Sequence, residues 1–175
     1  MTAQQALKDA LRERLGPSAR ERGYQGSAPT WRKSNAAGDW AVVNIQSSSS
    51  STSERLRCIL NLAVAPQPWL RLHGERLGRV MPKKVSESLG LYRRRLHPAA
   101  TPAGIEGWWE ISDAGSAAAA VQDMVEQLEL DGFPTLERML APKGMLQQVR
   151  SGDLGYIKRV HHEAFFAYAE AALSD

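Results

Sequence analysis

The chain has 175 residues, a formal net charge of +3 and a single cysteine. A hydrophobic content of 43% and a charged content of 23% are close to the averages for soluble globular domains, which argues against a disordered or fibrous chain. No apolar run approaches the roughly 20 residues that span a bilayer, and the polar start lacks the apolar stretch of a secretory signal. We therefore expect one cytosolic domain, over residues 1–175, that folds around a single core.

The first predicted element is an amphipathic helix over residues 6–22. Its apolar side chains recur at helical spacing, at Ala6, Leu7, Ala10, Leu11 and Leu15. Pro17 has no amide hydrogen and crowds the preceding turn, so the helix either ends at Gly16 or resumes for one turn before Gly23. A strand is expected to follow from Tyr24.

The pattern then changes to the alternation of β-strands. Three strands are predicted, over residues 30–33, 40–46 and 56–64, joined by turn residues at 34–39 and by a Ser/Thr loop at 47–53. They are expected to form an antiparallel meander. Side chains alternate across a strand, so one face of the third strand is predicted to be core and the other mixed. The mixed face carries Arg57, Ile59, Asn61 and Ala63.

The next segment is basic and rich in proline. Residues 69–78 predict a short helix or an irregular crossing, and the run at 91–96 is open between a strand and a helical turn. Residues 107–112 predict a further strand. Asp113 or Ser116 is the expected N-cap of a helix over about residues 117–130.

The remaining chain is predicted to be helical over residues 133–140, 145–150 and 154–173. In the last helix one apolar stripe is expected to carry Ile157, Val160, His161, Ala164, Phe165, Tyr168 and Ala172. The fold class that follows is α+β, with an N-terminal helix, an antiparallel sheet of four to five strands and C-terminal helices packed on one face.

Charge is unevenly distributed along the chain. Residues 55–97 contain ten Arg or Lys against only Glu75 and Glu87, whereas residues 106–137 contain eight acidic residues and no Arg or Lys. Such a two-signed surface can steer a charged partner, or the two signs can pair within the fold. We favour pairing within the fold.

A set of spaced landmarks resembles a known family. They are Gly23-Tyr24, Trp31-Arg32-Lys33, Val43-Asn44-Ile45-Gln46, Ile59-Leu60-Asn61-Leu62, Arg76-Leu77-Gly78 and Trp108-Trp109-Glu110. Their order and spacing are similar to the bacterial domain of unknown function family DUF4304, over about residues 5–140. The resemblance implies an α+β core and no assigned activity. The long loop at 47–53 and the basic insertion near 79–103 depart from the family pattern, and residues 141–175 are predicted to be a helical C-terminal extension.

A binding surface is predicted on the mixed face of the sheet. The candidate residues are Trp40, Asn44, Gln46, Arg57, Asn61, Arg76 and Trp108. Side-chain amides both donate and accept hydrogen bonds, which suits a polar ligand or a peptide backbone. The alternative, which we favour, is that the amides satisfy neighbouring backbone groups. Of the two adjacent indoles, one is expected in the core and the other on the mixed face or under a helix, with burial of both favoured.

No catalytic or cofactor motif accompanies this surface. Cys58 lies in an apolar strand and is expected to be a buried, inert thiol. The four histidines lack metal-ligand spacing, so no metal and no cofactor are predicted, and His161 is expected to be packed. A cluster of Glu106, Glu110 and Asp113 is interpreted as solvated rather than catalytic.

The sequence therefore favours a non-enzymatic domain that binds a protein or a small polar ligand through the mixed sheet face. The alternative is an enzyme or binding protein for a phosphate-bearing or nucleic-acid ligand, with Arg57, Arg71 and Arg76 as an anion clamp. A second basic set, Lys83, Lys84 and Arg93–Arg95, is a candidate for phosphate contacts, but a solvated loop or ion pairing with the acidic helix is the favoured interpretation of these residues. Nucleic acid is the less favoured partner, and no membrane partner is expected.

Overall fold

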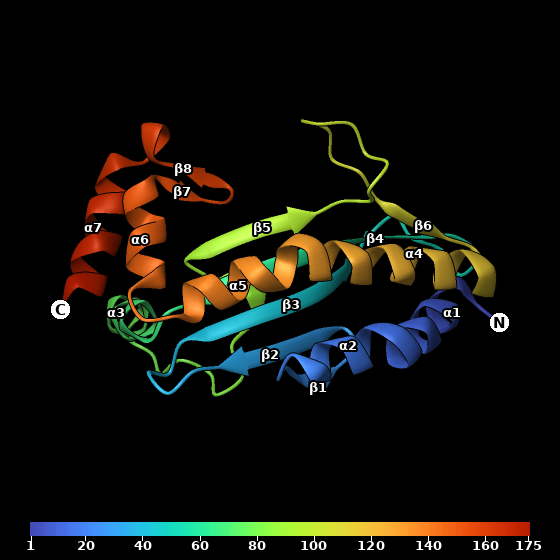
Figure 1. The fold of residues 1–175 in the computed structure, drawn as a ribbon, viewed down its shortest axis with the longest axis horizontal. Coiled ribbons are helices and arrows are strands. Elements are labelled where there is room, and N and C mark those ends of the chain that lie inside the picture. Colours follow the sequence, from blue (N-terminus) through green and yellow to red (C-terminus); the bar gives the residue numbers. More distant parts are fainter. The chain divides into compact units, whose positions relative to one another are not determined.

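The computed structural model of the protein describes residues 1–175 and has the predicted α+β class (Figure 1). The main sheet is antiparallel and has six strands in the order β1-β2-β3-β4-β5, with β6 paired to β4. The short strand β1 directly follows Tyr24, as expected, and the sheet has one strand more than the four to five predicted. None of the helices combines the length and the apolar character that crossing a membrane requires.

The strands are β1 (Gln25–Ser27), β2 (Thr30–Ser34), β3 (Trp40–Ser47), β4 (Leu56–Ala65), β5 (Tyr92–Leu96), β6 (Trp109–Ile111), β7 (Asp153–Leu154) and β8 (Ile157–Lys158). The α-helices are α1 (Ala3–Ala10), α2 (Gly16–Glu21), α3 (Gln67–Leu77), α4 (Ala114–Gln127), α5 (Phe133–Leu140), α6 (Gly144–Ser151) and α7 (Glu163–Ser174). The predicted strands at 30–33, 40–46 and 56–64 are therefore confirmed. The open assignments resolve to a helix at 67–77 and a strand at 92–96.

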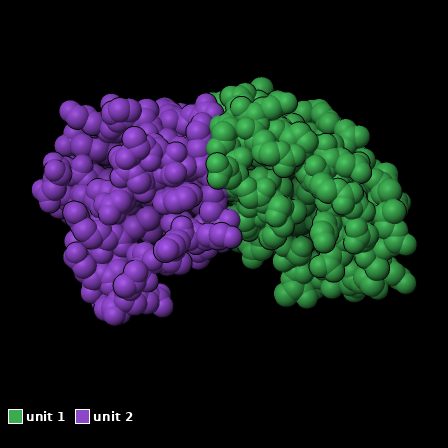
Figure 2. Space-filling view, turned by 90° about the horizontal axis from the view of Figure 1, so that it is seen from below, with its two compact units in different colours: residues 1–31, 43–61, 95–134 green, residues 32–42, 62–94, 135–175 purple.

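The chain divides into two compact units, which Figure 2 colours separately. Unit 1 comprises residues 1–31, 43–61 and 95–134, and unit 2 comprises residues 32–42, 62–94 and 135–175. The single domain predicted over the whole chain stays a prediction, and each unit is described by itself.

In unit 1, the N-terminal helix packs against α4, and α4 also packs against β6. Strand β6 pairs antiparallel with the start of β4, where Cys58 lies opposite Trp109. Helix α4 begins at the N-cap Asp113, whose side chain accepts the Ser116 backbone N–H while the Ser116 side chain accepts from the Asp113 backbone N–H. This reciprocal capping satisfies two of the amides that a helix start leaves unbonded.

Two prolines of unit 1 lie inside continuing helices because the turn before each one is widened. The Gly16 N–H donates to the Leu11 carbonyl, and the Phe133 N–H donates to the Leu128 carbonyl, so each bond joins residues that are five positions apart. A proline follows each donor directly. A ring at Pro17 would clash with the carbonyl four residues earlier in a regular helix, and a π-turn relieves that crowding. Of the two alternatives left open by the sequence, the helix resumes after Gly16.

In unit 2, one face of β3 and β4 is covered by α3 and by the chain that follows it. The buried apolar cluster there consists of Val42, Ala63, Ala65, Leu70 and Val85. Both faces of β4 are covered, since only Arg57 in the strand is exposed. The mixed face expected for this strand is thus largely buried.

The long helix predicted over residues 154–173 is wrong in its first half. A hairpin of β7 and β8 and a short 3-10 turn at Arg159–His161 precede α7. Gly152 and Gly155 both have φ of 81°, a conformation that ends a helix and that side chains rarely adopt.

The predicted apolar stripe changes with the hairpin. The buried residues of α7 are Phe166, Ala169 and Ala172. Val160 and His161 are exposed, so the prediction of a packed His161 is also wrong.

Candidate functional site

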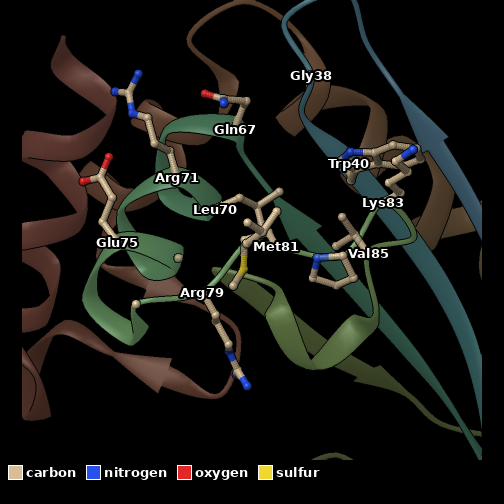
Figure 3. Close-up of a pocket in the computed structure, with 14 residues that line it drawn as sticks. Gly38, Trp40, Gln67, Leu70, Arg71, Glu75, Arg79, Met81, Lys83 and Val85 are labelled. Atoms are coloured by element: carbon tan, nitrogen blue, oxygen red, sulfur yellow. The ribbon is translucent and has the colours of Figure 1, made fainter.

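An open pocket lies in unit 2, between α3, the start of β3 and the chain that follows α3 (Figure 3). Its volume is about 630 Å³. The apolar residues that line it are Trp40, Leu70, Val80, Met81, Pro82 and Val85. The polar and charged residues that line it are Gln67, Arg71, Glu75, Arg79 and Lys83. A volume between roughly 300 and 1,000 Å³ with an apolar lining is typical of ligand sites.

Local sequence chemistry builds the α3 side of this pocket. Pro66 precedes α3 in an extended conformation, and the Gln67 backbone N–H donates to Asp39 at 2.8 Å. At the other end Gly78 adopts φ of 61° and ends the helix, as a left-handed glycine commonly does. The chain then folds back so closely that a Cβ on Gly74 would lie 2.9 Å from the Arg79 carbonyl oxygen. A side chain at position 74 would therefore push the pocket wall away.

Two side chains hold the segment after α3 in place. Arg32 donates from Nε to the Val85 backbone carbonyl at 2.6 Å. Glu87 accepts from Nη2 of Arg93 at 2.9 Å, and Arg93 belongs to β5. The arginine of the Trp31-Arg32-Lys33 landmark therefore has a structural role, because it holds Val85 in the pocket floor.

The rim of the pocket carries an excess of positive charge, and its cations make no ion pairs. Arg71, Arg79 and Lys83 are all exposed, and none of them makes an ion pair or a side-chain hydrogen bond. The only acidic residue of the rim is Glu75. Because long cationic side chains with no partner attract anions, this rim favours a negatively charged ligand.

The acidic residues of 106–137, by contrast, are largely used inside the fold. Glu110 pairs with Arg55 and Arg57, and Arg95 donates to Glu106 at 2.6 Å. Asp113 caps α4, and Asp123 accepts a hydrogen bond from the Trp109 indole. Glu129 accepts from Ser18 and Arg22, and Glu137 forms an ion pair with Lys33. Pairing of the two charge signs within the fold is confirmed for Glu106, Glu110, Glu129 and Glu137, and of these Glu106 and Glu110 pair with arginines of residues 55–97. The uncompensated positive charge is left at 71–84.

Three of the predicted site residues form an amide cluster in unit 1. Asn61 is buried, and its Nδ2 donates to Asn44 Oδ1 at 3.3 Å and to Gln46 Oε1 at 3.0 Å. Asn44 donates in turn to the Thr30 hydroxyl at 2.9 Å. Both amide hydrogens of Asn61 are therefore committed within the protein. The structure brings these residues together, and binding by them stays a prediction.

Two further predicted residues form a stacked pair in unit 1. The Arg57 guanidinium lies 5.4 Å from the Trp108 ring centroid, a cation–π arrangement. Trp109, the neighbouring indole, is buried and donates to Asp123 at 2.8 Å. One indole in the core and the other beside Arg57 matches one of the two alternatives left open by the sequence. The favoured alternative, burial of both indoles, was wrong, because Trp108 is only half-buried.

The last two predicted residues belong to unit 2. Trp40 lines the pocket, whereas Arg76 lies over the Tyr168 ring at 5.2 Å and links α3 to α7. Of the three arginines proposed as an anion clamp, only Arg71 lines the pocket. Sequence reasoning did not single out Met81, Val85 or Arg79 as site residues. The one signal for them was the basic character of the segment that contains them.

The side chains that line the pocket can bind a ligand but include few groups that take part in catalysis. Its lining includes no Ser, Thr, Cys or His, and Glu75 is its only carboxylate. The cysteine lies elsewhere, and burial raises the pKa of the Cys58 thiol to about 12, so that it stays protonated and unreactive.

The fold and this pocket define an α+β domain with a basic surface site. The sequence model of the domain of unknown function DUF4304 matches residues 15–138, so the chain belongs to that family. The match includes every residue of the pocket and leaves out α6 and α7. No curated protein and no solved structure matches the chain.

Proposed function

We propose that this DUF4304 member is a non-enzymatic binding protein of the bacterial cytosol, and that the pocket around Trp40 takes an anionic ligand. The observation that carries the proposal is the charge distribution. Arg71, Arg79 and Lys83 surround an apolar floor with no partner of their own, while the acids at 106–137 are bonded elsewhere. Cations at a partly apolar surface bind anions more strongly than cations in open water.

The amide cluster supports a binding role less well than the pocket does. Asn61 is 3% exposed, and an external ligand would have to displace its bonds to Asn44 and Gln46. Breaking such bonds costs about as much as new ones would gain. The pocket requires no such exchange.

Nucleic acid is a weaker candidate for the ligand. Arg93 and Arg95 are bonded to Glu87 and Glu106. Lys83 and Lys84 are left as uncommitted cations of the predicted phosphate-contacting set, and duplex binding generally uses several more contacts.

Titrations followed by amide NMR spectra test the proposal. The probes are inorganic phosphate, ATP, a polyglutamate peptide and a short DNA duplex, each added to the wild-type protein at low salt. Saturable shifts at residues 38–40 and 67–85 are expected with at least one probe, and the affinity should fall as salt is raised because exposed charges are screened.

Two charge-matched triple variants provide the control. Arg71→Gln, Arg79→Gln and Lys83→Gln together should weaken binding by about tenfold or more, since each lost charge-assisted contact is worth about 0.5–1 kcal/mol or more. Lys8→Gln, Arg20→Gln and Arg138→Gln remove the same charge from exposed positions outside the pocket and should bind as wild type. Absence of pocket shifts with every probe, or equal weakening by both triples, would overturn the proposal.

A further inference from the structure

Resting on the proposed function, we infer that the pocket's ligand is an extended acidic segment of a partner protein, which inserts one apolar side chain between Trp40 and Met81. Four features of the pocket carry this inference: the directions of its cations, the nature of its floor, the exposed apolar surface at its edge and its openness to solvent.

The cations of the pocket do not converge on one point. Figure 3 shows Arg71 and Arg79 extending away from each other, while Lys83 lies on the Trp40 side. A phosphate group is bound tightly when several donors point at the same small anion. Cations spread around a rim instead match carboxylates that are spaced along a chain. The arrangement therefore favours several separate negative charges over one phosphate.

The floor of the pocket is apolar. Leu70 and Val85 belong to the buried cluster of unit 2, and Trp40 and Met81 pack against that cluster while still lining the pocket. An indole offers a large, rigid contact surface, and the flexible thioether of methionine adapts to different partners. Such a floor suits a single leucine-like or aromatic side chain.

The edge of the pocket offers more apolar surface. Val80 is 95% exposed and Leu77, at the end of α3, is 48% exposed. Val80 lines the pocket and directly follows Arg79, a cation that makes no ion pair. Apolar area beside charges of one sign is the composition expected for recognition of a peptide of opposite sign with an apolar anchor.

The shape of the pocket points the same way. It is largely open to solvent, so a small molecule would stay largely exposed to water, whereas compact ligand sites usually bury most of the ligand. An extended peptide can lie across such an open surface. Glu75 lies on the Arg71 side in Figure 3, so the partner's carboxylates are expected chiefly against Arg79 and Lys83.

Fluorescence anisotropy with a designed peptide tests the inference. The probe is a fluorescein-labelled short peptide with one central leucine flanked on both sides by glutamates. One matched peptide has serine in place of leucine, and another has glutamines in place of the glutamates. Both changes should weaken binding about tenfold or more, because burying a leucine side chain contributes about 1.5–3 kcal/mol and the charges supply the rest.

A pair of exposed valines gives matched protein variants. Val80→Glu places a negative charge at the pocket edge and should weaken binding of the leucine peptide about tenfold. Val160→Glu adds the same charge at a site that is 76% exposed and lies outside the pocket, and its affinity should stay within about twofold of wild type. Both positions are exposed, so both variants should fold, and a thermal melt checks this.

The outcomes separate this inference from the proposed function. If ATP, phosphate or DNA shifts the pocket resonances while the leucine peptide does not bind, the peptide inference is overturned and anion binding stands. Equal affinity for the leucine and serine peptides also overturns it, because the apolar floor would then contribute nothing. If no anionic probe binds at the pocket, both proposals fail together.

Discussion

Arg32 in β2 donates a hydrogen bond to the backbone carbonyl of Val85, with 2.6 Å between Nε and the oxygen. The two residues are 53 positions apart in the sequence, and this bond fixes the segment after α3 against the sheet of unit 2. Val85 is buried beside Leu70, so the bond also positions the apolar floor of the pocket.

Loss of that bond should loosen the pocket. Arg32→Met keeps much of the apolar stem of the side chain but leaves the carbonyl without its charged donor, at a cost of about 2 kcal/mol in unfolding free energy. Amide hydrogen exchange at residues 79–90 should become faster than in wild type. Arg71→Met is the control, since it removes an arginine that makes no such bond. Equal exchange rates at residues 79–90 in the two variants would show that the Arg32 bond does not hold this segment in place.

The amide cluster is expected to contribute to stability. Asn61→Ala removes two buried hydrogen bonds and should lower the unfolding free energy by about 1–3 kcal/mol, measured by urea denaturation. Gln46→Ala removes an exposed partner of the same cluster, and water can replace its contact, so a change within about 0.5 kcal/mol is expected. If Asn61→Ala melts like wild type and loses a ligand, the amide face is a binding surface after all.

Cys58 should not react with thiol reagents in the folded protein. Burial raises the pKa of the Cys58 thiol from 9.0 to about 12, so the thiolate is essentially absent at neutral pH. We expect no reaction with a thiol reagent in buffer at pH 8 and complete reaction in denaturing urea. Rapid labelling of the native protein would contradict the assigned burial.

The start of α4 should respond to acid. Hydrogen bonds from the Ser116 backbone and side chain lower the pKa of Asp113 below its usual 3.8. A lowered pKa in the folded state means that the stabilisation is present above pH 3.8 and is lost as the pH falls through the folded pKa.

Thermal melts of Asp113→Asn and Asp113→Ala test this cap. Asparagine caps helices nearly as well as aspartate, so its melting temperature at pH 7 should be close to wild type, and below pH 4 it should lose less stability on acidification. Alanine should melt lower than wild type at pH 7. A melting temperature for Asp113→Ala equal to that of wild type would show that the cap is unimportant.

The C-terminal hairpin should depend on one glycine. Gly155 has φ of 81°, and an added Cβ would lie 1.7 Å from the Arg93 carbonyl oxygen. Gly104 has a similar φ of 79° with nothing within 4 Å of an added Cβ. Gly104→Ala should therefore cost about 1–2 kcal/mol for the backbone alone, and Gly155→Ala substantially more. If both substitutions lower the unfolding free energy by the same amount in urea denaturation, the close contact of Gly155 with Arg93 does not constrain the hairpin.

Most of the secondary structure followed from local patterns. The strands at 30–34, 40–47 and 56–65 alternate apolar and polar residues or contain a continuous apolar run, and Asp113 with Ser116 forms a recognisable helix start. The C-terminal helix was misjudged because Ile157 and Val160 fit a helical stripe. Two glycines with positive φ, and the contact of Gly155 with β5, override that pattern.

The candidate site was less visible in the sequence. Asn44, Gln46 and Asn61 were identified as polar residues in apolar strands, but whether their amides face a ligand or each other depends on the register between neighbouring strands. The same limit applies to the charges. The excess of basic residues at 55–97 was evident, yet pairing with distant acids decides which of them are left without a partner.

Local sequence by itself determined the α+β class, the family and the excess of positive charge, because helix and strand periods, capping residues and residue counts are properties of neighbouring positions. Only the tertiary structure decided that Arg71, Arg79 and Lys83 surround an apolar pocket while Asn61 is sealed. Burial and charge pairing depend on residues that are distant in the chain, and the folded backbone alone brings those together.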